Sequence, residues 1–253
     1  MDFSLSEEQR MLKDTVERLV RETYDFEKRQ KISESEEGFS REVWGQLAEL
    51  GLLGVPFPED FGGLGGGGID LMIVGEAIGQ GLVVEPYLST VVLGGGLVEL
   101  LGSDAQKEEI LGAVVGGEKL LAFAHGEPDG RYETAHVRAT AEKVGGGWKL
   151  TGRKSVVLNG GEADTLIVSA RVSGAHDDED GIGLFLVDKG AANMKLHSTP
   201  AIDGTRVAEI ALDGVEVGAD AVLGTPGACF QAIEEVLARA IILLSGEAVG
   251  AMN

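Results

Sequence analysis

The sequence predicts an α+β protein in which a helical part is followed by a β domain and then by a further helix. Apolar residues recur at helical spacing up to about Gly117. Short apolar segments separated by turn residues follow from Lys119, and the helical period returns after Thr225-Pro226-Gly227. The changes of periodicity predict an N-terminal α-helical domain at 1–118, a middle β domain at 119–225 and the first helix of a C-terminal helical domain at 226–253.

Capping patterns mark the starts of several helices in the N-terminal part. Ser6 can accept a hydrogen bond from a free helix N–H while Gln9 reaches back, as in a capping box. Ser40 is a typical N-cap residue, and Gly51 is a typical helix stop. Further predicted features are an apolar face of Val43, Leu47 and Leu50, apolar helices at Leu71–Ile78 and Leu88–Leu101, and a helix between Ser103–Gln106 and Gly116-Gly117.

The middle part is predicted to be a compact antiparallel β domain. Gly145-Gly146-Gly147 lies between two of its segments and favours a hairpin, because glycine adopts positive φ without steric cost. Val137, Ala139 and Ala141 are alternate residues and should share one face of a strand. The acidic run His176–Asp180 is expected to be a solvated loop. The predicted strand segments are Leu120–Ala124, Val137–Val144, Trp148–Thr151, Thr165–Arg171, Gly183–Asp188 and Val207–Leu212.

The last segment is an apolar helical pattern without a stop signal. Phe230, Ile233, Ile241 and Leu244 recur at helical spacing, and apolar character continues to Met252. An apolar helix needs a partner that buries it. We therefore expect that the chain is cut inside a larger protein or assembles tightly, and that this helix on its own exposes a large apolar strip.

The composition is that of a globular protein and argues against several functions. Hydrophobic residues make up 43% of the 253 residues and charged residues make up 25%. The net charge of −21 argues against nucleic-acid binding, which needs clustered lysine and arginine. No apolar run is long enough to span a bilayer, and the acidic N-terminus lacks the features of a signal peptide. A single cysteine, Cys229, fits a reducing compartment, so we expect a cytoplasmic protein.

Several motifs have a structural explanation that outweighs a functional one. Gly63–Gly68 satisfies the G-x-G-x-x-G pattern, but it does not follow a predicted strand as a dinucleotide-binding loop must, so a structural loop is favoured. Cys229 lacks a catalytic partner signature and is expected to pack in the interior. The four histidines have no i,i+4 pairing and no cysteine partners, so no metal site is predicted. They are His125, His136, His176 and His197.

An ordered set of short motifs points to one protein family. Each motif alone is modest, but their order and spacing together are specific. The motifs are Phe3–Gln9, Trp44–Gly54, Pro58–Gly65, Glu127-Pro128, Asn159–Asp164 and Asp213–Val217. In this order the chain closely resembles the acyl-CoA dehydrogenase family over essentially its whole length.

The resemblance implies an acyl-CoA dehydrogenase-like fold with an N-terminal helical domain, a middle β domain and a C-terminal four-helix domain. It also implies an acyl-CoA thioester as substrate and FAD as cofactor. In the family reaction a glutamate removes the α-proton while the β-hydrogen passes as hydride to flavin N5. Hydrogen bonds to the thioester carbonyl stabilise the developing enolate.

The residues that would contact FAD depart from the family pattern. Phe123 keeps an aromatic side chain, whereas Gly126 stands where the family has threonine. Leu158 replaces a second threonine, and its side chain cannot donate a hydrogen bond. Backbone N–H groups at His125, Gly126 and Leu158 could still bind a flavin. The resemblance therefore assigns cofactor binding to Phe123, His125, Gly126 and Leu158. Two further losses are the family serine, replaced within Arg131-Tyr132-Glu133, and the family tryptophan, replaced by Val156.

No catalytic base can be assigned from the sequence. Some family members place the glutamate at the start of the first C-terminal helix, but Ala238–Ile241 holds no carboxylate. Glu234, Glu235 and Glu247 lie nearby without matching the motif, and we interpret them as solvated helix residues. Other members place the base late in the C-terminal domain, and the catalytic residue is expected there.

Two functional hypotheses follow from these departures. In the first, the chain is a flavoprotein that dehydrogenates an acyl-CoA at the α,β position with FAD as hydride acceptor. In the second, it is a non-catalytic structural subunit of a heteromeric acyl-CoA dehydrogenase, with a degraded FAD site and a related partner subunit. Val156–Gly160 resembles the small subunits of pimeloyl-CoA-type and steroid-side-chain acyl-CoA dehydrogenases. A homo- or hetero-oligomer is expected under both hypotheses. An unrelated helical and β binding module is the remaining alternative.

Overall fold

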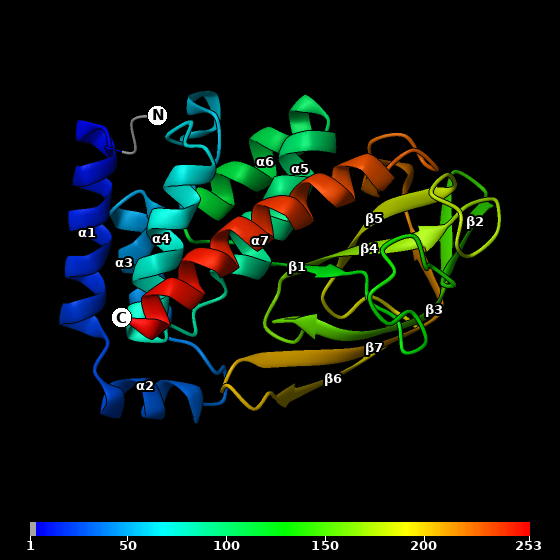
Figure 1. Cartoon of the computed structure of the whole chain (residues 1–253). Coiled ribbons are helices and arrows are strands. Elements are labelled where there is room, and N and C mark those ends of the chain that lie inside the picture. Colours follow the sequence, from blue (N-terminus) through cyan, green and yellow to red (C-terminus); the bar gives the residue numbers. More distant parts are fainter. Residues whose placement is uncertain (1–3) are drawn as a thin grey trace.

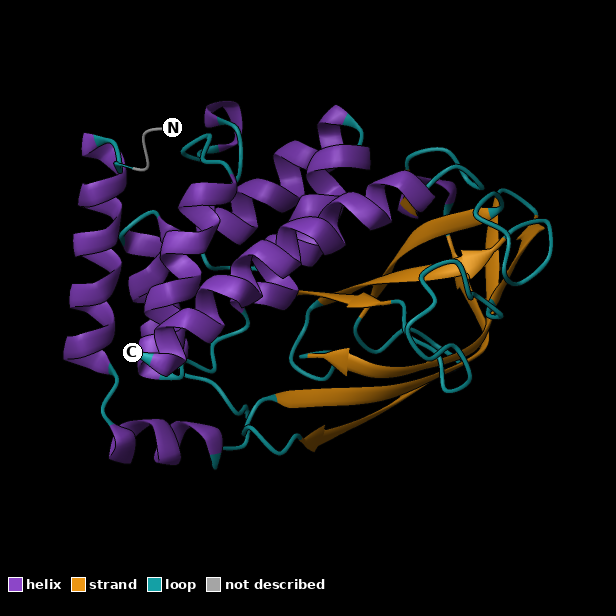
Figure 2. Ribbon diagram, viewed as in Figure 1, coloured by secondary structure: helices purple, strands orange, loops and turns teal. Residues whose placement is uncertain are grey.

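The computed structural model describes residues 4–253 and shows two parts side by side (Figure 1). Helices fill one side of the molecule and a β-sheet fills the other (Figure 2). The predicted α+β class is confirmed. Phe3, the first residue of the opening motif, lies outside the described residues. None of the described helices combines the length and the apolar character needed to cross a membrane.

The helices begin where the sequence places capping residues. Ser6 Oγ accepts a hydrogen bond from the Gln9 N–H at 3.1 Å, and Gln9 Oε1 accepts one from the Ser6 N–H, which completes the predicted capping box. Ser40 caps its helix by accepting from the Val43 N–H. Leu50 is not on the apolar face as predicted, because it is the C-cap residue and is exposed. The helices are α1 (Glu7–Thr23), α2 (Phe26–Ser33), α3 (Arg41–Glu49), α4 (Gly68–Gly81), α5 (Gly96–Leu101), α6 (Asp104–Val115) and α7 (Phe230–Met252), with 3-10 turns η1 (Leu52–Gly54), η2 (Glu59–Phe61) and η4 (Ala219–Ala221).

The sheet is mixed rather than wholly antiparallel. Leu121–Ala124 pairs in parallel with Thr165–Val168, and Thr140 makes a parallel pair with Arg171. The prediction of an antiparallel domain is wrong for two strand pairs, β1 with β4 and β2 with β4. It assumed that neighbouring segments form hairpins, whereas residues 125–139 form a long connection, and strands joined by long connections can run in the same direction. The strands are β1 (Leu121–Ala124), β2 (Thr140–Val144), β3 (Gly147–Leu158), β4 (Thr165–Arg171), β5 (Ile182–Asp188), β6 (Met194–Pro200), β7 (Arg206–Val217) and β8 (Val222–Leu223), in the order β6-β7-β3-β2-β4-β5-β8 with β1 beside β4.

The predicted hairpin joins β2 to β3, and Gly145 in its turn has a φ of +58°. Val137, Ala139 and Ala141 are buried and alternate with exposed residues, as expected for one face. β3 continues well beyond the predicted end at Thr151. Apolar periodicity does not predict this second half of β3, nor β6, because many of these residues are polar or half-buried.

The segment predicted as one helix at Leu88–Leu101 is a π-helix, η3 (Leu88–Gly95), that continues into α5. Thr90 Oγ1 donates to the Leu121 carbonyl at 3.1 Å and accepts from the Leu121 N–H at 3.2 Å. Ser89 Oγ donates to Asn159 Oδ1 at 2.9 Å. π-helical turns are rare and often occur at functional sites. This one attaches the helical part to β1 and to the end of β3.

Glycines bring α4 and α7 into close contact (Figure 1). Gly75 and Gly79 lie against the backbone of α7, and Gly246 and Gly250 lie against the backbone of α4. A Cβ atom on Gly79 would lie 1.9 Å from the Glu247 carbonyl oxygen. One face of α7 is buried, whereas large apolar side chains elsewhere on the helix are exposed, as the sequence predicts. The exposed large apolar residues of α7 are Ile241, Ile242, Leu244, Val249 and Met252.

We predict that Gly79→Ala destabilises the protein by about 1–3 kcal/mol, because the added methyl group forces the α4 and α7 backbones apart. Urea unfolding followed by circular dichroism measures the change. Gly112→Ala is the matched control, since Gly112 is also helical and has open space around its Cβ position. The free energy of unfolding of the Gly112→Ala control should rise by about 0.5–1 kcal/mol, because alanine has a higher helix propensity than glycine. Equal effects of the two substitutions would contradict close packing at this crossing.

Candidate functional site

Three of the four predicted cofactor-binding residues lie in β1 or directly after it. Phe123 is buried and its ring stacks on His125, with centroids 5.0 Å apart and planes inclined by 11°. His125 Nε2 lies 3.0 Å from the Thr134 carbonyl, and its Nδ1 lies 2.9 Å from Ser169 Oγ. Burial and the nearby Lys154 ammonium lower the pKa of His125 to about 3. The imidazole is therefore neutral, and both of its nitrogens are already used inside the protein.

Lys154 lies beneath this segment and is fully buried. Its Nζ donates to Glu127 Oε1 at 2.7 Å, to Ser169 Oγ at 3.0 Å and to the His125 carbonyl at 3.1 Å. These three contacts use all the hydrogens of the ammonium group. Burial lowers the pKa of Lys154 to about 8, although the Glu127 carboxylate opposes this effect. The ammonium thus ties β3 to the chain that leaves β1.

Glu127, from the Glu-Pro motif, is the structural partner of Lys154. Its carboxylate also accepts hydrogen bonds from the Arg138 N–H at 2.9 Å and the Ala139 N–H at 3.0 Å. Burial alone would raise the pKa of Glu127, but Lys154 and these backbone donors lower it. Sequence reasoning missed Lys154. The available signal was its place on β3 four residues after the buried Leu150, which puts both side chains on the inward face.

Gly126 lies against β3. Its carbonyl accepts from the Ser155 N–H at 2.8 Å, and a Cβ atom here would lie 3.1 Å from the Ser155 carbonyl oxygen. Beyond Ser155, β3 shifts register against β7, and Val156 adopts a φ of +52° with 66% of its surface exposed. A β-branched residue at positive φ is an outlier, and bulges of this kind often lie beside functional sites. The bulge exposes the apolar side chain of Val156, at the position where the resemblance implies a tryptophan.

The predicted cofactor-binding residues do not gather around one cavity. His125 and Gly126 line a cavity of about 120 Å³ together with Leu237 of α7. Leu158 lines another cavity, of about 250 Å³, beside Asn159 and Leu243. At these positions phenylalanine, glycine and leucine have no side-chain donor, and the histidine nitrogens are engaged. The four residues therefore do not fit a flavin held by side-chain hydrogen bonds.

The cavity beside Leu158 also contains acidic groups. Glu247 of α7 is half-buried, and burial together with the Asp203 carboxylate raises its pKa. It is therefore not the solvated helix residue that the sequence predicted, because the close α4–α7 packing brings it inward. Glu234 and Glu235 are exposed, as predicted. Glu85, also in this cavity, is buried and accepts hydrogen bonds from the Tyr24 hydroxyl and the Ser40 N–H.

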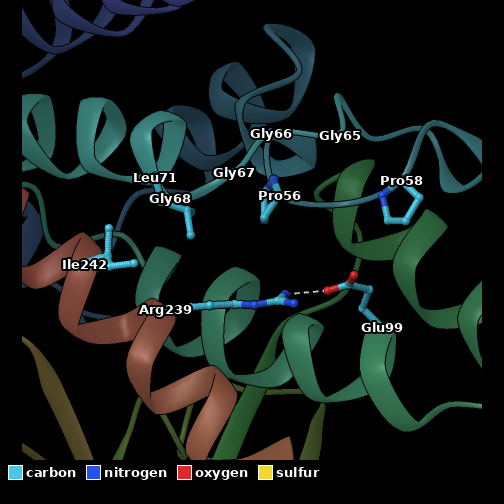
Figure 3. Close-up of a pocket in the computed structure, with 10 residues that line it drawn as sticks. All are labelled: Pro56, Pro58, Gly65, Gly66, Gly67, Gly68, Leu71, Glu99, Arg239 and Ile242. Carbon is cyan, nitrogen blue, oxygen red and sulfur yellow. Dashed lines mark hydrogen bonds and ion pairs between the residues drawn. The ribbon is translucent and has the colours of Figure 1, made fainter. Parts of the chain in front are cut away.

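Arg239, from the segment Ala238–Ile241, lines a third cavity, of about 420 Å³ (Figure 3). Arg239 extends across it and pairs with Glu99 at 2.5 Å, while its other guanidinium nitrogen pairs with Glu235 at 2.7 Å. The opposite wall is formed by Gly65–Gly68, which follows an irregular segment and not a strand. The glycine-rich motif is thus a structural loop, as predicted. Among the described residues that line this cavity, the Glu99 carboxylate and the Arg239 guanidinium pair with each other.

The remaining histidines occupy different surroundings. His197 lies on β6, at an edge of the sheet. His136 and His176, which are forty positions apart in the sequence, lie together with Asp177. This grouping was not predicted, because sequence spacing reveals only ligands that are neighbours along a helix or loop. Cys229 is buried, as predicted.

The helical domain, the mixed sheet and the returning helix together form the acyl-CoA dehydrogenase fold, which is also that of the butyryl-CoA dehydrogenase of Megasphaera elsdenii. The chain matches the acyl-CoA dehydrogenase N-terminal domain over residues 6–118 and the acyl-CoA dehydrogenase middle domain over residues 122–215. The chain therefore belongs to the acyl-CoA dehydrogenase family.

Individual relatives agree with this assignment. The mitochondrial isovaleryl-CoA dehydrogenase of Pongo abelii is 32% identical over 257 residues, covering 98% of this chain and 60% of the relative. The solved FAD complex of PigA has a TM-score of 0.90 at 25% identity, covering 100% of this chain and 67% of that one. The ChsE4–ChsE5 complex from Mycobacterium tuberculosis has a TM-score of 0.86 at 26% identity, covering 99% of this chain and 65% of the matched chain. The chain thus spans about 60% of the length of isovaleryl-CoA dehydrogenase.

We predict that Lys154→Met destabilises the protein by about 3–5 kcal/mol, because it leaves the buried Glu127 carboxylate without its partner. The free energy of unfolding in urea tests this value. Lys143→Met, on the exposed surface of β2, is the control and should change stability by less than about 0.5 kcal/mol. The double variant Glu127→Gln/Lys154→Met should recover part of the loss. If Lys154→Met were as stable as Lys143→Met, a structural role for the Lys154–Glu127 pair would be ruled out.

Proposed function

We propose that this chain serves the α,β-dehydrogenation of an acyl-CoA thioester as a subunit of a heteromeric acyl-CoA dehydrogenase. In this proposal a related subunit holds the FAD that accepts the hydride. The observation that carries the proposal is the absence of side-chain donors at Gly126 and Leu158, and of an aromatic wall at Val156, within a fold that otherwise keeps the family architecture. The solved ChsE4–ChsE5 structure is a complex of two differently named proteins, and its fold resembles this chain.

The energetics of cofactor binding support the proposal. A neutral hydrogen bond contributes about 0.5–1.5 kcal/mol net, and aromatic packing adds a comparable amount. Each loss of about 1.4 kcal/mol weakens binding tenfold. Three such losses at Gly126, Val156 and Leu158 would together weaken FAD binding by roughly one to three orders of magnitude.

In this proposal the acyl chain lies in the cavity that Leu158 lines, away from its carboxylates Glu85, Asp203 and Glu247. The cavity of about 250 Å³ between α4, the end of β3 and α7 has an apolar lining that includes Ile78, Leu88 and Leu243. Such a lining suits an acyl chain, because burial of methylene groups is favourable at about 0.8 kcal/mol each. The finer kinship, with the small subunits of pimeloyl-CoA-type or steroid-side-chain enzymes, rests on Val156–Gly160.

The alternative is that the chain itself is a flavoenzyme. It would then hold FAD through backbone N–H groups at His125, Gly126 and Leu158. The FAD complex of PigA, whose fold is similar, favours this alternative. The two proposals differ in one observable property, namely whether the chain on its own retains the cofactor.

We predict that the chain purified alone contains little or no FAD and does not reduce an electron-accepting dye when an acyl-CoA is added. Flavin per polypeptide is measured from the visible spectrum after release of the cofactor. Dye reduction should appear once a related acyl-CoA dehydrogenase subunit is co-expressed with the chain. Stoichiometric FAD together with turnover by the chain alone would refute the subunit proposal and leave the enzyme alternative standing.

We also predict that Leu158→Thr strengthens FAD binding by up to roughly tenfold, because it restores one hydroxyl donor worth about 0.5–1.5 kcal/mol. Val144→Thr is the matched control, since Val144 is an exposed strand residue in the β2–β3 hairpin. Equilibrium titration with FAD, followed by flavin fluorescence, compares the variants with the natural chain. An unchanged affinity for the Leu158 variant would show that this position does not face the cofactor.

A further inference from the structure

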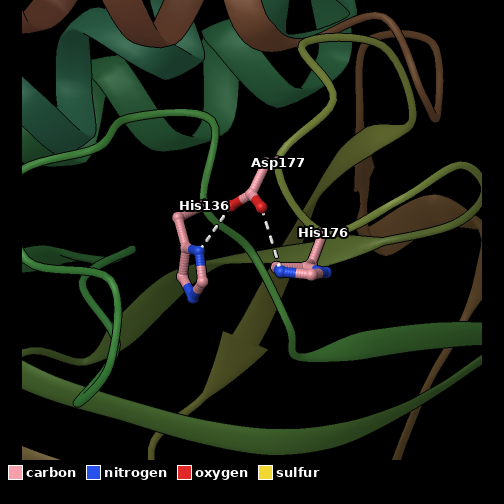
Figure 4. A group of neighbouring side chains, drawn as sticks. All are labelled: His136, His176 and Asp177. Carbon is pink, nitrogen blue, oxygen red and sulfur yellow. Dashed lines mark hydrogen bonds and ion pairs between the residues drawn. The ribbon is translucent and has the colours of Figure 1, made fainter.

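Two loops at the far end of the sheet bring a second group of reactive side chains together (Figure 4). The Asp177 carboxylate lies between two imidazoles, with Oδ1 at 2.6 Å from His136 Nδ1 and Oδ2 at 3.0 Å from His176 Nε2. The two rings meet edge to face, with centroids 5.2 Å apart. One nitrogen of each histidine and an oxygen of the aspartate all lie within 4.8 Å of one another.

The backbone beneath this group is firmly held. Arg171 at the end of β4 is buried, and its guanidinium donates to the carbonyls of both loops. On one side it binds Ala135 at 2.8 Å, and on the other it binds His176 at 3.0 Å. The Val137 N–H also donates to the His176 carbonyl at 2.8 Å. The remaining contacts of the guanidinium are the carbonyls of Val137, Asp178 and Asp180.

We propose that His136, His176 and Asp177 form a binding site for a transition-metal ion, with Zn²⁺ as the best match. Imidazole nitrogens select zinc and its neighbours over magnesium and calcium, which prefer oxygen ligands. Three protein ligands with a fourth position for water form a common open zinc arrangement.

The geometry permits coordination with small movements. Zinc binds imidazole nitrogen and carboxylate oxygen at about 2.0–2.2 Å, which places tetrahedral ligand atoms about 3.4 Å apart. The ligand atoms here lie within 4.8 Å of one another, so the more distant atoms must approach, while the two contacts of Asp177 at 2.6 and 3.0 Å must open slightly. The side chains of His176 and Asp177 are 51% and 63% exposed, so they have room to move toward a common centre once a metal ion replaces their mutual contact. The side chain of His136 is only 13% exposed and provides a fixed ligand.

The local charge also favours a cation. Asp177 is followed by Asp178, Glu179 and Asp180, and the whole run is exposed. The positive charge of Arg171 opposes a cation, but its hydrogens are directed at backbone carbonyls and the acidic run outweighs it. The acidic segment that the sequence predicts to be a simple solvated loop thus has a second use as the wall of the site.

Metal binding would join two parts of the chain near the candidate site. His136 lines the same cavity of about 120 Å³ as His125 and Gly126. A metal between His136 and the 176–177 loop therefore restrains the connection between β1 and β2. This inference is independent of the proposed acyl-CoA chemistry, because neither the acyl cavity nor Leu158 takes part in it.

The test is calorimetric titration of Zn²⁺ into the tag-free, EDTA-treated and dialysed full chain. We expect one ion per chain, and a Kd that rises by at least about tenfold in His176→Ala and in Asp177→Asn. His197→Ala is the matched control, because it removes a histidine outside the group, and it should bind like the natural chain. Both test positions are exposed, so these variants are expected to fold, which circular dichroism checks.

Co²⁺ provides a readout that a purely structural role would not change. Bound to two imidazoles and a carboxylate, it should give visible absorption bands that disappear in His176→Ala and persist in His197→Ala. Zn²⁺ should also raise the Tm of the natural chain and not that of His176→Ala. Absence of stoichiometric binding, or equal binding by the His176 and His197 variants, would overturn the proposal.

Discussion

A buried ion pair between Lys154 and Glu127 holds together the segments on which the candidate site is built. Lys154 belongs to the middle of β3, and Glu127 follows the end of β1 and binds the backbone just before β2. Removing two charges from water is costly, and the cost is recovered only when every donor and acceptor finds a partner. Here the ammonium has three acceptors and the carboxylate has three donors. The Glu-Pro motif is therefore explained by architecture and does not require contact with a ligand.

Local chemistry in the sequence predicts much of the fold. The capping box at Ser6, the N-cap at Ser40 and the hairpin at Gly145 depend on interactions within a few residues, and each forms as expected. The parallel pairing of β1 with β4 depends on contacts between segments more than forty positions apart, which periodicity does not encode. Lys154 was missed for a related reason. A lysine in a strand is normally exposed unless it is paired, and its partner Glu127 lies far away in the sequence.

The resemblance directed attention to the end of β1 and the end of β3, and part of what the structure shows there could not be predicted from the sequence. The neutral, fully engaged imidazole of His125 and the positive φ at Val156 could be found only in three dimensions. Glu247 turns inward because glycines at the α4–α7 crossing let the helices approach, and helical periodicity alone assigns it to solvent. The family fold is thus present, whereas the four residues predicted to contact a flavin offer no free side-chain donor.

We propose that this chain keeps the acyl-CoA dehydrogenase architecture but binds FAD only weakly on its own. The most direct test is a calorimetric titration of FAD into the purified natural chain, with and without a co-purified related subunit. The account predicts no saturable binding in the micromolar range for the chain alone and tight, stoichiometric binding for the pair. Tight binding of one FAD by the chain alone would contradict it.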